Sequence, residues 1–324
     1  MAIKKKRVLI TINPGLIDGK WFPTVRSLVS ALDKTTDLTV ATVGDYDFSS
    51  KKVRAYKRIK YGKFEEIGMV APKADLWIVY SDGYWLDARA LGFKKRIDFF
   101  RSQVDLHMHH LSNHNVDLIV NEPLAEKRTL KSWFSTLDAN KTGVIPTVDL
   151  QNIDEVRQLR QLKDVIVAKL SWGGAMMGTK KLGSDDDVDA FKKELSEDAP
   201  YTSLKDYCFQ DYAPSPSEKR FWIAGGKVVG ARLLFGRRVP WETHGNEKGY
   251  LYDEQTEGYA RDRAAVENLL KLSDLKVGSI DFIGPMINEI NGCGTVFTYF
   301  QEKDLLLDFR KPMVDSFLQI LNQL

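Results

Sequence analysis

Cysteine is scarce in this sequence, with only Cys208 and Cys293 among 324 residues. The two lie far apart and form no CxxC pair, which argues against a disulfide framework or a zinc knuckle. We expect both to be reduced. No apolar run approaches the roughly 18 residues of a membrane span. The opening MAIKKKRVLITI places basic residues before only a strand-length apolar run, so we expect no secretory signal and a cytoplasmic protein.

An excess of one charge is also absent. The chain has 47 Lys and Arg residues against 44 Asp and Glu residues, for a formal net charge of +3. This balance gives no general case for nucleic-acid or membrane binding and favours small ligands or proteins as partners. The length exceeds that of one typical domain, and a hydrophobic content of 43% is enough for a substantial core. We therefore expect two or three lobes.

The two commonest phosphate-binding fingerprints, GxGxxG and GxxxxGK[ST], are missing. Their absence argues against a Rossmann dehydrogenase and a P-loop NTPase. The first 120 residues instead alternate short apolar runs with helical patterns. Strands are predicted at 7–13, 38–43, 74–80 and 116–120, with a helix at 23–33 after the first strand. This order predicts a small α/β domain with a parallel sheet over residues 1–122.

Two further modules are predicted after it. Residues 123–204 carry the apolar strand VIVAKL, which runs into a glycine turn in SWGGAMMG. Residues 205–324 contain strand pairs around Gly225-Gly226 and Gly284-Pro285, separated by a helix at 261–272.

Three oxygen-bearing side chains gather in the segment SIDFIGPMINEINGCGT, which begins at Ser279. Asp281, Glu289 and Asn291 fall on two apolar runs joined by a Gly-Pro turn. Two carboxylates and an amide oxygen suit Mg²⁺, which keeps waters and substrate phosphates in its other positions. The alternative is an ordinary hairpin with polar residues on its solvated face.

In order along the chain, VIVAKLSWGGAMMG, FQDYAP, EKRFWIAGGKVVGARLL, WETHGN and DFIGPMINEIN resemble segments of the ATP-grasp superfamily, and specifically of bacterial glutathione synthetase and its relatives. The resemblance covers roughly residues 121–295. It implies an α/β (α+β) ATP-grasp fold with an N-terminal parallel-sheet domain on the substrate side. Residues 123–204 would be the central lid subdomain and residues 205–324 the catalytic subdomain.

The resemblance also implies nucleotide-binding roles. Lys169 would contact the ATP phosphates, since an ammonium at the end of an apolar strand is costly to bury without a partner. The alternative is a lysine that reaches water from a strand edge. Backbone N–H groups at Gly173 and Gly174 would approach the phosphates. The adenine hinge would be formed by Gln210, Asp211 and Tyr212.

Catalytic roles are implied for Arg220 and Arg232 near the transferring phosphoryl group, and for Asn246 in ETHGN. His244 stands where relatives have arginine. An arginine holds a carboxylate or phosphate with two hydrogen bonds, whereas histidine is a weaker partner whose charge depends on pH. A further nucleotide contact would come from EKRTLKSWFS. The spacing does not decide which of Lys127, Arg128 and Lys131 would contact the nucleotide, and we favour Lys127. The alternative is that these residues form a solvated basic face of a helix.

The activity that the resemblance implies is ATP-dependent ligation of a carboxylate to an amine through an acyl phosphate. ATP and Mg²⁺ are the expected cofactors, with two ions bound at Asp281, Glu289 and Asn291 and Mn²⁺ as an alternative ion. The other partners would be a small carboxylate and an amine, such as an amino acid or peptide, and a second copy of the chain in a homo-oligomer. The alternative function is that of a non-catalytic ATP-binding regulator or scaffold.

Two features fall outside the resemblance. His107, His110 and His114 have a spacing that could place imidazoles on one helical face as metal ligands, although a helix end explains the same pattern. Residues 51–63 (KKVRAYKRIKYGK) are basic and interleaved with tyrosines. A solvated segment, recognition of an acidic substrate, and contact with nucleic acid are the three interpretations.

Overall fold

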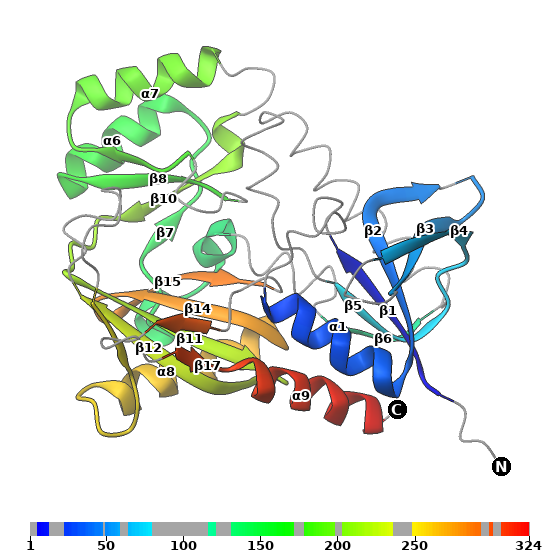
Figure 1. Ribbon diagram of the computed structural model, residues 1–324. Coiled ribbons are helices and arrows are strands. Elements are labelled where there is room, and N and C mark those ends of the chain that lie inside the picture. The colour runs from blue at the N-terminus through cyan, green and yellow to red at the C-terminus, as the bar shows by residue number, and fades with distance from the viewer. Residues whose placement is uncertain are drawn as a thin grey trace.

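Three sheets follow one another along the chain, and a two-stranded sheet lies near its C-terminal end in the computed structural model (Figure 1). The described residues are 5–12, 23–47, 49–58, 64–79, 116–120, 131–171, 178–197, 203–235, 248–292, 298–300 and 306–323. None of the helices within these ranges is both long and apolar enough to cross a membrane.

The N-terminal sheet has six strands in the order β4-β3-β2-β1-β5-β6. They are β1 (Arg7–Ile12), β2 (Asp37–Asp47), β3 (Lys52–Arg58), β4 (Phe64–Val70), β5 (Ala74–Val79) and β6 (Val116–Val120). Strands β2, β1, β5 and β6 are parallel, which confirms the predicted sheet. Strands β3 and β4 extend it antiparallel and were not predicted. Val53 and Ala55 are buried on β3, so the basic segment 51–63 is partly an ordinary half-buried strand.

Two helices, α1 (Pro23–Thr35) and α9 (Arg310–Gln323), pack side by side against this sheet (Figure 1). Leu28 and Leu32 of α1 share one core with Met313 and Phe317 of α9. Trp222, from the third sheet, is buried in the same core. Because apolar burial is the dominant stabilising contribution to folding, this shared core fixes the first sheet to the third.

The second sheet has the order β7-β10-β8-β9. Its strands are β7 (Thr147–Val148), β8 (Ile166–Leu170), β9 (Lys180–Leu182) and β10 (Tyr207–Asp211), and its helices are α6 (Ile153–Lys163) and α7 (Asp185–Glu197). Both helices cover one face, in a core that is separate from the first. Strand β10 comes after the predicted domain boundary at 204/205, yet it pairs with β8 of this sheet. The boundary itself stays a prediction.

The third sheet has five strands in the order β13-β12-β11-β14-β15. They are β11 (Ser217–Ala224), β12 (Lys227–Phe235), β13 (Lys248–Leu251), β14 (Val277–Ile283) and β15 (Met286–Asn291). The predicted turns at Gly225-Gly226 and Gly284-Pro285 are confirmed. Helix α8 (Tyr259–Ser273) covers one face, together with the short α5 (Ala139–Thr142).

Short elements complete the fold. They are the 3₁₀ helices η3 (Lys131–Thr136) and η4 (Leu204–Asp206) and the paired strands β16 (Thr298–Phe300) and β17 (Leu306–Asp308). Residues 143–145 run along the outer edge of β15, where Ile287 N donates to Gly143 O and Ile145 N donates to Ile287 O. This segment links the second sheet to the third.

Candidate functional site

Four charged residues form one row across the third sheet. Arg232 of β12 pairs with Arg220 of β11, which pairs with Asp281 of β14, which pairs with Glu289 of β15. Directly opposite residues of neighbouring strands share a face of the sheet. Their neighbours along the strands, among them Phe221 and Ile280, point to α8 instead. The row therefore places two guanidinium groups beside two carboxylates on the face away from α8.

The centre of the row is a bidentate ion pair. Arg220 donates from Nε to Asp281 Oδ1 at 2.7 Å and from Nη2 to Asp281 Oδ2 at 2.5 Å. Asn291 adds a hydrogen bond from Nδ2 to Asp281 Oδ2 at 3.1 Å. The Asp281 carboxylate is almost fully buried. Such forks fix geometry as well as charge, so the sheet holds Asp281 in one orientation.

At the end of the row, Lys131 Nζ lies 3.2 Å from Glu289 Oε2. Burial alone would raise the pKa of the Glu289 carboxyl. The positive charges of Lys131, Lys169 and Arg220 outweigh that effect and lower this pKa to about 2. Glu289 is therefore a carboxylate at every physiological pH. Of the three basic residues that spacing could not separate, Lys131 is described and lies beside this carboxylate, whereas Lys127 and Arg128 lie outside the described residues.

Lys169 reaches the same strand from the second sheet. It is only 8% exposed, and its Nζ donates to Asn288 Oδ1 at 2.5 Å. Asn288 is an extra residue in β15, because the pairing steps from Asp281 with Glu289 to Phe282 with Ile287. The bulge turns the Asn288 amide toward Lys169. The Asn288 amide thus supplies one hydrogen-bond acceptor to this buried ammonium.

The second sheet presents a polar face to the third. Tyr207 and Phe209 of β10 pack against α6 and α7, so the alternating Cys208 and Gln210 lie on the opposite face. Cys208 pairs directly with Lys169 across β8 and β10. Burial raises the pKa of the Cys208 thiol to about 11, and the charges of Lys131 and Lys169 only partly offset it. This raised pKa and its burial favour the neutral thiol over the thiolate at Cys208.

Gln210 carries a buried acceptor at this face. Its Nε2 donates to Thr147 Oγ1 at 3.2 Å, while Thr147 Oγ1 donates to Ile145 O at 2.8 Å. These two bonds fix which end of the amide is nitrogen. Its Oε1 is buried and has no hydrogen-bond partner among the described residues. Since buried polar atoms are normally hydrogen-bonded, Oε1 is suited to accept a bond from a ligand donor.

The other two predicted hinge residues face the rim of the second sheet. Asp211 accepts a hydrogen bond from Lys163 Nζ at 3.0 Å, and its backbone N donates to Pro146 O. The Tyr212 ring lies under Lys181 Nζ, 4.8 Å from the ring centroid. Both residues continue directly from Gln210 at the end of β10, and the hinge role of the three stays a prediction.

Sequence reasoning missed two polar residues of the cleft. Asn288 was passed over because its role depends on a strand bulge. Glu218 is buried and lies two residues before Arg220 on the same face of β11. The period-two alternation of Glu218, Arg220 and Trp222 is a signal that could have found it. Lys127, Gly173, Gly174 and Asn246, together with His244 and the histidines at 107–114, lie outside the described residues.

The oxygen donors fit Mg²⁺. Asp281, Glu289 and Asn291 offer two carboxylates and an amide from two adjacent strands, and the contact of Asn291 with Asp281 brings two of them together. Within the described part of the chain no group of three His, Cys, Asp or Glu side chains could hold a metal. The predicted set has only two such side chains, which leaves other positions for phosphate oxygens.

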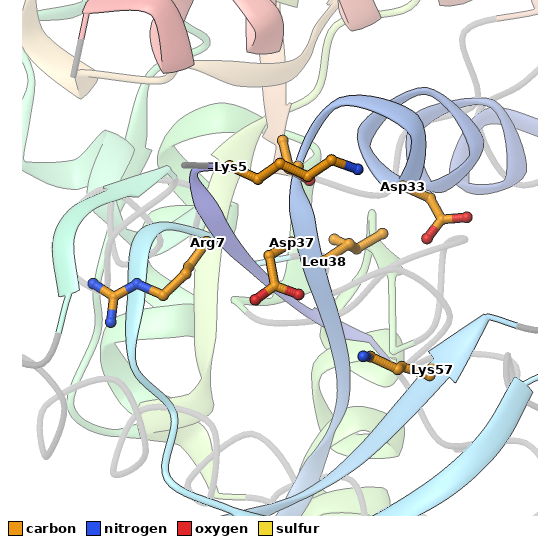
Figure 2. Close-up of a pocket in the computed structure, with 7 residues that line it drawn as sticks. Lys5, Arg7, Asp33, Asp37, Leu38 and Lys57 are labelled. Atoms are coloured by element: carbon orange, nitrogen blue, oxygen red, sulfur yellow. The ribbon is translucent and has the colours of Figure 1, made fainter. Parts of the chain in front are cut away.

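A separate cleft of about 530 Å³ lies where β1 and β2 begin and α1 ends, lined by Lys5, Arg7, Asp33, Thr36, Asp37, Leu38 and Lys57 (Figure 2). Figure 2 shows the Arg7 guanidinium turned away from the other charged groups. It pairs with Asp75, with Nη2 and Oδ1 2.6 Å apart. Lys57, from the basic segment 51–63, thus faces a cleft that also contains two carboxylates. This mixture fits the solvated interpretation of that segment, which stays a prediction.

No protein-family model and no curated protein matches the sequence. Solved structures do match. The ATP-grasp ligase PsnB complexed with minimal precursor superposes with a TM-score of 0.59 at 15% identity, over 98% of this chain and 99% of that chain. The macrocyclase MdnC bound with precursor peptide MdnA, from Microcystis aeruginosa MRC, superposes with a TM-score of 0.59 at 15% identity, over 98% of this chain and 100% of that chain.

The D-alanyl-alanine synthetase A from Vibrio cholerae gives a TM-score of 0.60 at 12% identity, over 99% of this chain and 97% of that chain. Coverage of both partners in these comparisons is nearly complete. The chain therefore has the ATP-grasp fold, as predicted. The likeness extends to ATP-grasp ligases in general and does not single out glutathione synthetase.

Proposed function

We propose that this protein is an ATP-dependent carboxylate-amine ligase that forms an amide or peptide bond. The observation that carries the proposal is the row of Arg232, Arg220, Asp281 and Glu289, which Lys131 and Lys169 face. Carboxylates suit metal ions, and the surrounding cations suit phosphate groups. Phosphoryl transfer depends mostly on positioning and charge, and this row supplies both without a side-chain nucleophile.

Asp281, Glu289 and Asn291 are proposed to hold two Mg²⁺ ions, with Mn²⁺ as the alternative ion. When bound, the metal would neutralise negative charge on the phosphates. A solved neighbour supports this choice, because one structure of PsnB is complexed with minimal precursor, Mg and ADP. Among the chain's own residues, Asp281 and Glu289 supply the negative charge, and the pKa of Glu289 keeps it ionised.

The nucleotide is proposed to lie between the second and third sheets. Gln210 Oε1 would accept a hydrogen bond from the adenine amino group, since it is a buried acceptor that the described residues leave unmatched. Asp211 and Tyr212 would continue the hinge, and Glu218 is a candidate for the ribose hydroxyls. Lys131 and Lys169 would contact the phosphates. Gly173, Gly174 and Lys127 keep the nucleotide-binding roles that the sequence predicts.

The proposed reaction has two steps. A substrate carboxylate oxygen attacks the γ-phosphorus of ATP, the bond to ADP breaks, and an acyl phosphate forms. The amine nitrogen then attacks the acyl carbon, a proton leaves the nitrogen, and phosphate departs with its bonding electrons. Arg220, Arg232 and Asn246 are proposed to stabilise the negative charge of both steps.

Amino acids or peptides are the proposed substrates. The solved neighbours include ligases bound to precursor peptides and a D-alanyl-alanine synthetase. Cytoplasmic localisation and homo-oligomerisation are part of the same proposal. Pooled carboxylates and amines, incubated with MgATP and followed by mass spectrometry, test it. The ligase account requires a condensation product and, with ¹⁸O in the carboxylate, transfer of one label to phosphate. A product without that transfer would argue against the acyl phosphate.

A second candidate is a non-catalytic ATP-binding regulator or scaffold. One observation favours it: Asp281 is already held by Arg220, and Glu289 by Lys131, so both carboxylates have partners from the chain itself. Tight MgATP binding without ADP release in any substrate pool would support this candidate.

A further inference from the structure

Ser171 connects the strand of Lys169 to the helix of Lys131. It directly follows β8 and precedes the glycine turn. Its carbonyl oxygen accepts a hydrogen bond from Lys131 N at 3.0 Å, and its Oγ accepts one from Ser132 N at 2.8 Å. Its own N donates to Asp206 O at 2.8 Å. Ser171 is buried, and its two partners in η3 are half-buried.

These bonds fix the beginning of η3. The first N–H groups of a helix have no partner inside the helix and must be satisfied from outside. Ser171 satisfies two successive ones, through its backbone and its side chain. The hydroxyl is therefore the only part of this contact that a substitution can remove while the backbone contact stays.

From that anchored start, the Lys131 side chain extends to Glu289, with Nζ 3.2 Å from Oε2, and is only 12% exposed. Lys169, two residues before Ser171, reaches the adjacent Asn288. One stretch of three residues thus places two cations at neighbouring positions of β15. It places Lys169 directly and Lys131 through η3.

We propose that Ser171 is a positioning residue whose hydroxyl holds η3 so that the Lys131 ammonium stays over the metal and phosphate site. The inference rests on the proposed function, because it assumes that Lys131 contacts MgATP. Small displacements of a charged group from its working geometry weaken an interaction sharply. Ser171 would act on the ligand only through Lys131.

A double-mutant cycle on MgATP binding tests this directly. The dissociation constant of the magnesium complex of AMPPNP is measured by calorimetry for the wild type, Ser171→Ala, Lys131→Met and the double variant. We expect Ser171→Ala to weaken binding about fivefold, the scale of one lost hydrogen bond. In the Lys131→Met background the same change should have no further effect. Ser196→Ala, which removes a hydroxyl from α7, should bind like the wild type.

Two isosteric variants separate positioning from folding. Ser171→Thr keeps the hydroxyl, whereas Ser171→Val replaces it with a methyl group of similar size. The proposal requires wild-type affinity for the threonine variant and weakened affinity for the valine variant. Equal effects of Ser171→Ala with and without Lys131, or equal affinity of the two isosteric variants, would overturn it. Failure of the wild type to bind the nucleotide would instead contradict the proposed function.

Discussion

Arg220 and Asp281 stand directly opposite each other on β11 and β14 and share two parallel hydrogen bonds, at 2.7 and 2.5 Å. The pair joins the cationic half of the row to its anionic half. Each carboxylate oxygen has further lone pairs, one of which accepts the bond from Asn291. Asp281 can therefore keep its arginine and still offer oxygen to a cation.

Replacing Arg220 with lysine should reduce activity without unfolding the protein. Lysine keeps the charge but loses the planar fork, so it cannot hold Asp281 bidentately and also face the phosphate. We expect ADP formation to fall by about 10²-fold, the scale of one lost charge-stabilising donor. Arg54→Lys is the matched control, because Arg54 lies on β3 and pairs with the exposed Glu66. Equal rates for the two variants would remove Arg220 from the proposed machinery.

Gly278 should not tolerate a side chain. A Cβ at this position of β14 would lie 2.1 Å from the backbone oxygen of Asn291. Gly278→Ala must therefore displace the end of β15 that carries a proposed metal ligand. We expect weaker magnesium binding and a lower thermal midpoint. Gly183→Ala, whose Cβ would meet nothing closer than 3.7 Å, should change neither, and a tight metal site in Gly278→Ala would contradict the geometry.

A buried charge network on the opposite face should contribute to stability and not to catalysis. Asp262 of α8 pairs with Lys219 and accepts a hydrogen bond from the Tyr252 hydroxyl at 2.8 Å. Asp262→Ala leaves the Lys219 ammonium buried without its carboxylate, which should cost about 3–5 kcal/mol. Urea denaturation measures this loss. The double variant Lys219→Met/Asp262→Leu should lose less unfolding free energy than Asp262→Ala, because it leaves no unpaired buried ammonium. A larger loss in the double variant would contradict this explanation.

Acidification should weaken the attachment of β1 to β5. Arg7 donates to both oxygens of Asp75, and these hydrogen bonds hold the pKa of Asp75 below its ordinary value. The folded pKa is lower than the unfolded one, so the stabilisation is complete above about pH 4 and is lost as the pH falls further. Thermal midpoints measured across this range should drop more for the wild type than for Asp75→Asn. Parallel curves would refute the assignment.

The sequence was most informative where the signal is local. Gly284-Pro285 separates two apolar runs, and the structure confirms Asp281 and Glu289 as opposite residues of the resulting strands. Spacing did not separate Lys127, Arg128 and Lys131, and the preference for Lys127 stays a prediction. The contact of Lys131 with Glu289 could not be predicted, because it joins residues far apart in the sequence. The orientation of the Gln210 amide, which leaves Oε1 as a buried acceptor, likewise depends on a contact with the distant Thr147.

Strands β3 and β4 show a different difficulty. The alternation of Lys52, Val53, Arg54 and Ala55 is that of a half-buried strand, but the basic charge of the segment dominated its interpretation. Burial of Val53 and Ala55 is decided by the neighbouring strand β2, which the local sequence does not contain.

The most direct test of the account is magnesium-dependent ADP release by the wild type, Glu289→Gln and Glu65→Gln, with pooled carboxylates and amines. Glu65 is an exposed carboxylate on β4, so its variant controls for the loss of one charge. We predict ADP release that requires magnesium and a substrate pool, is unchanged in Glu65→Gln and is abolished in Glu289→Gln. Wild-type turnover by Glu289→Gln, with an unchanged circular dichroism spectrum, would contradict the proposed metal site.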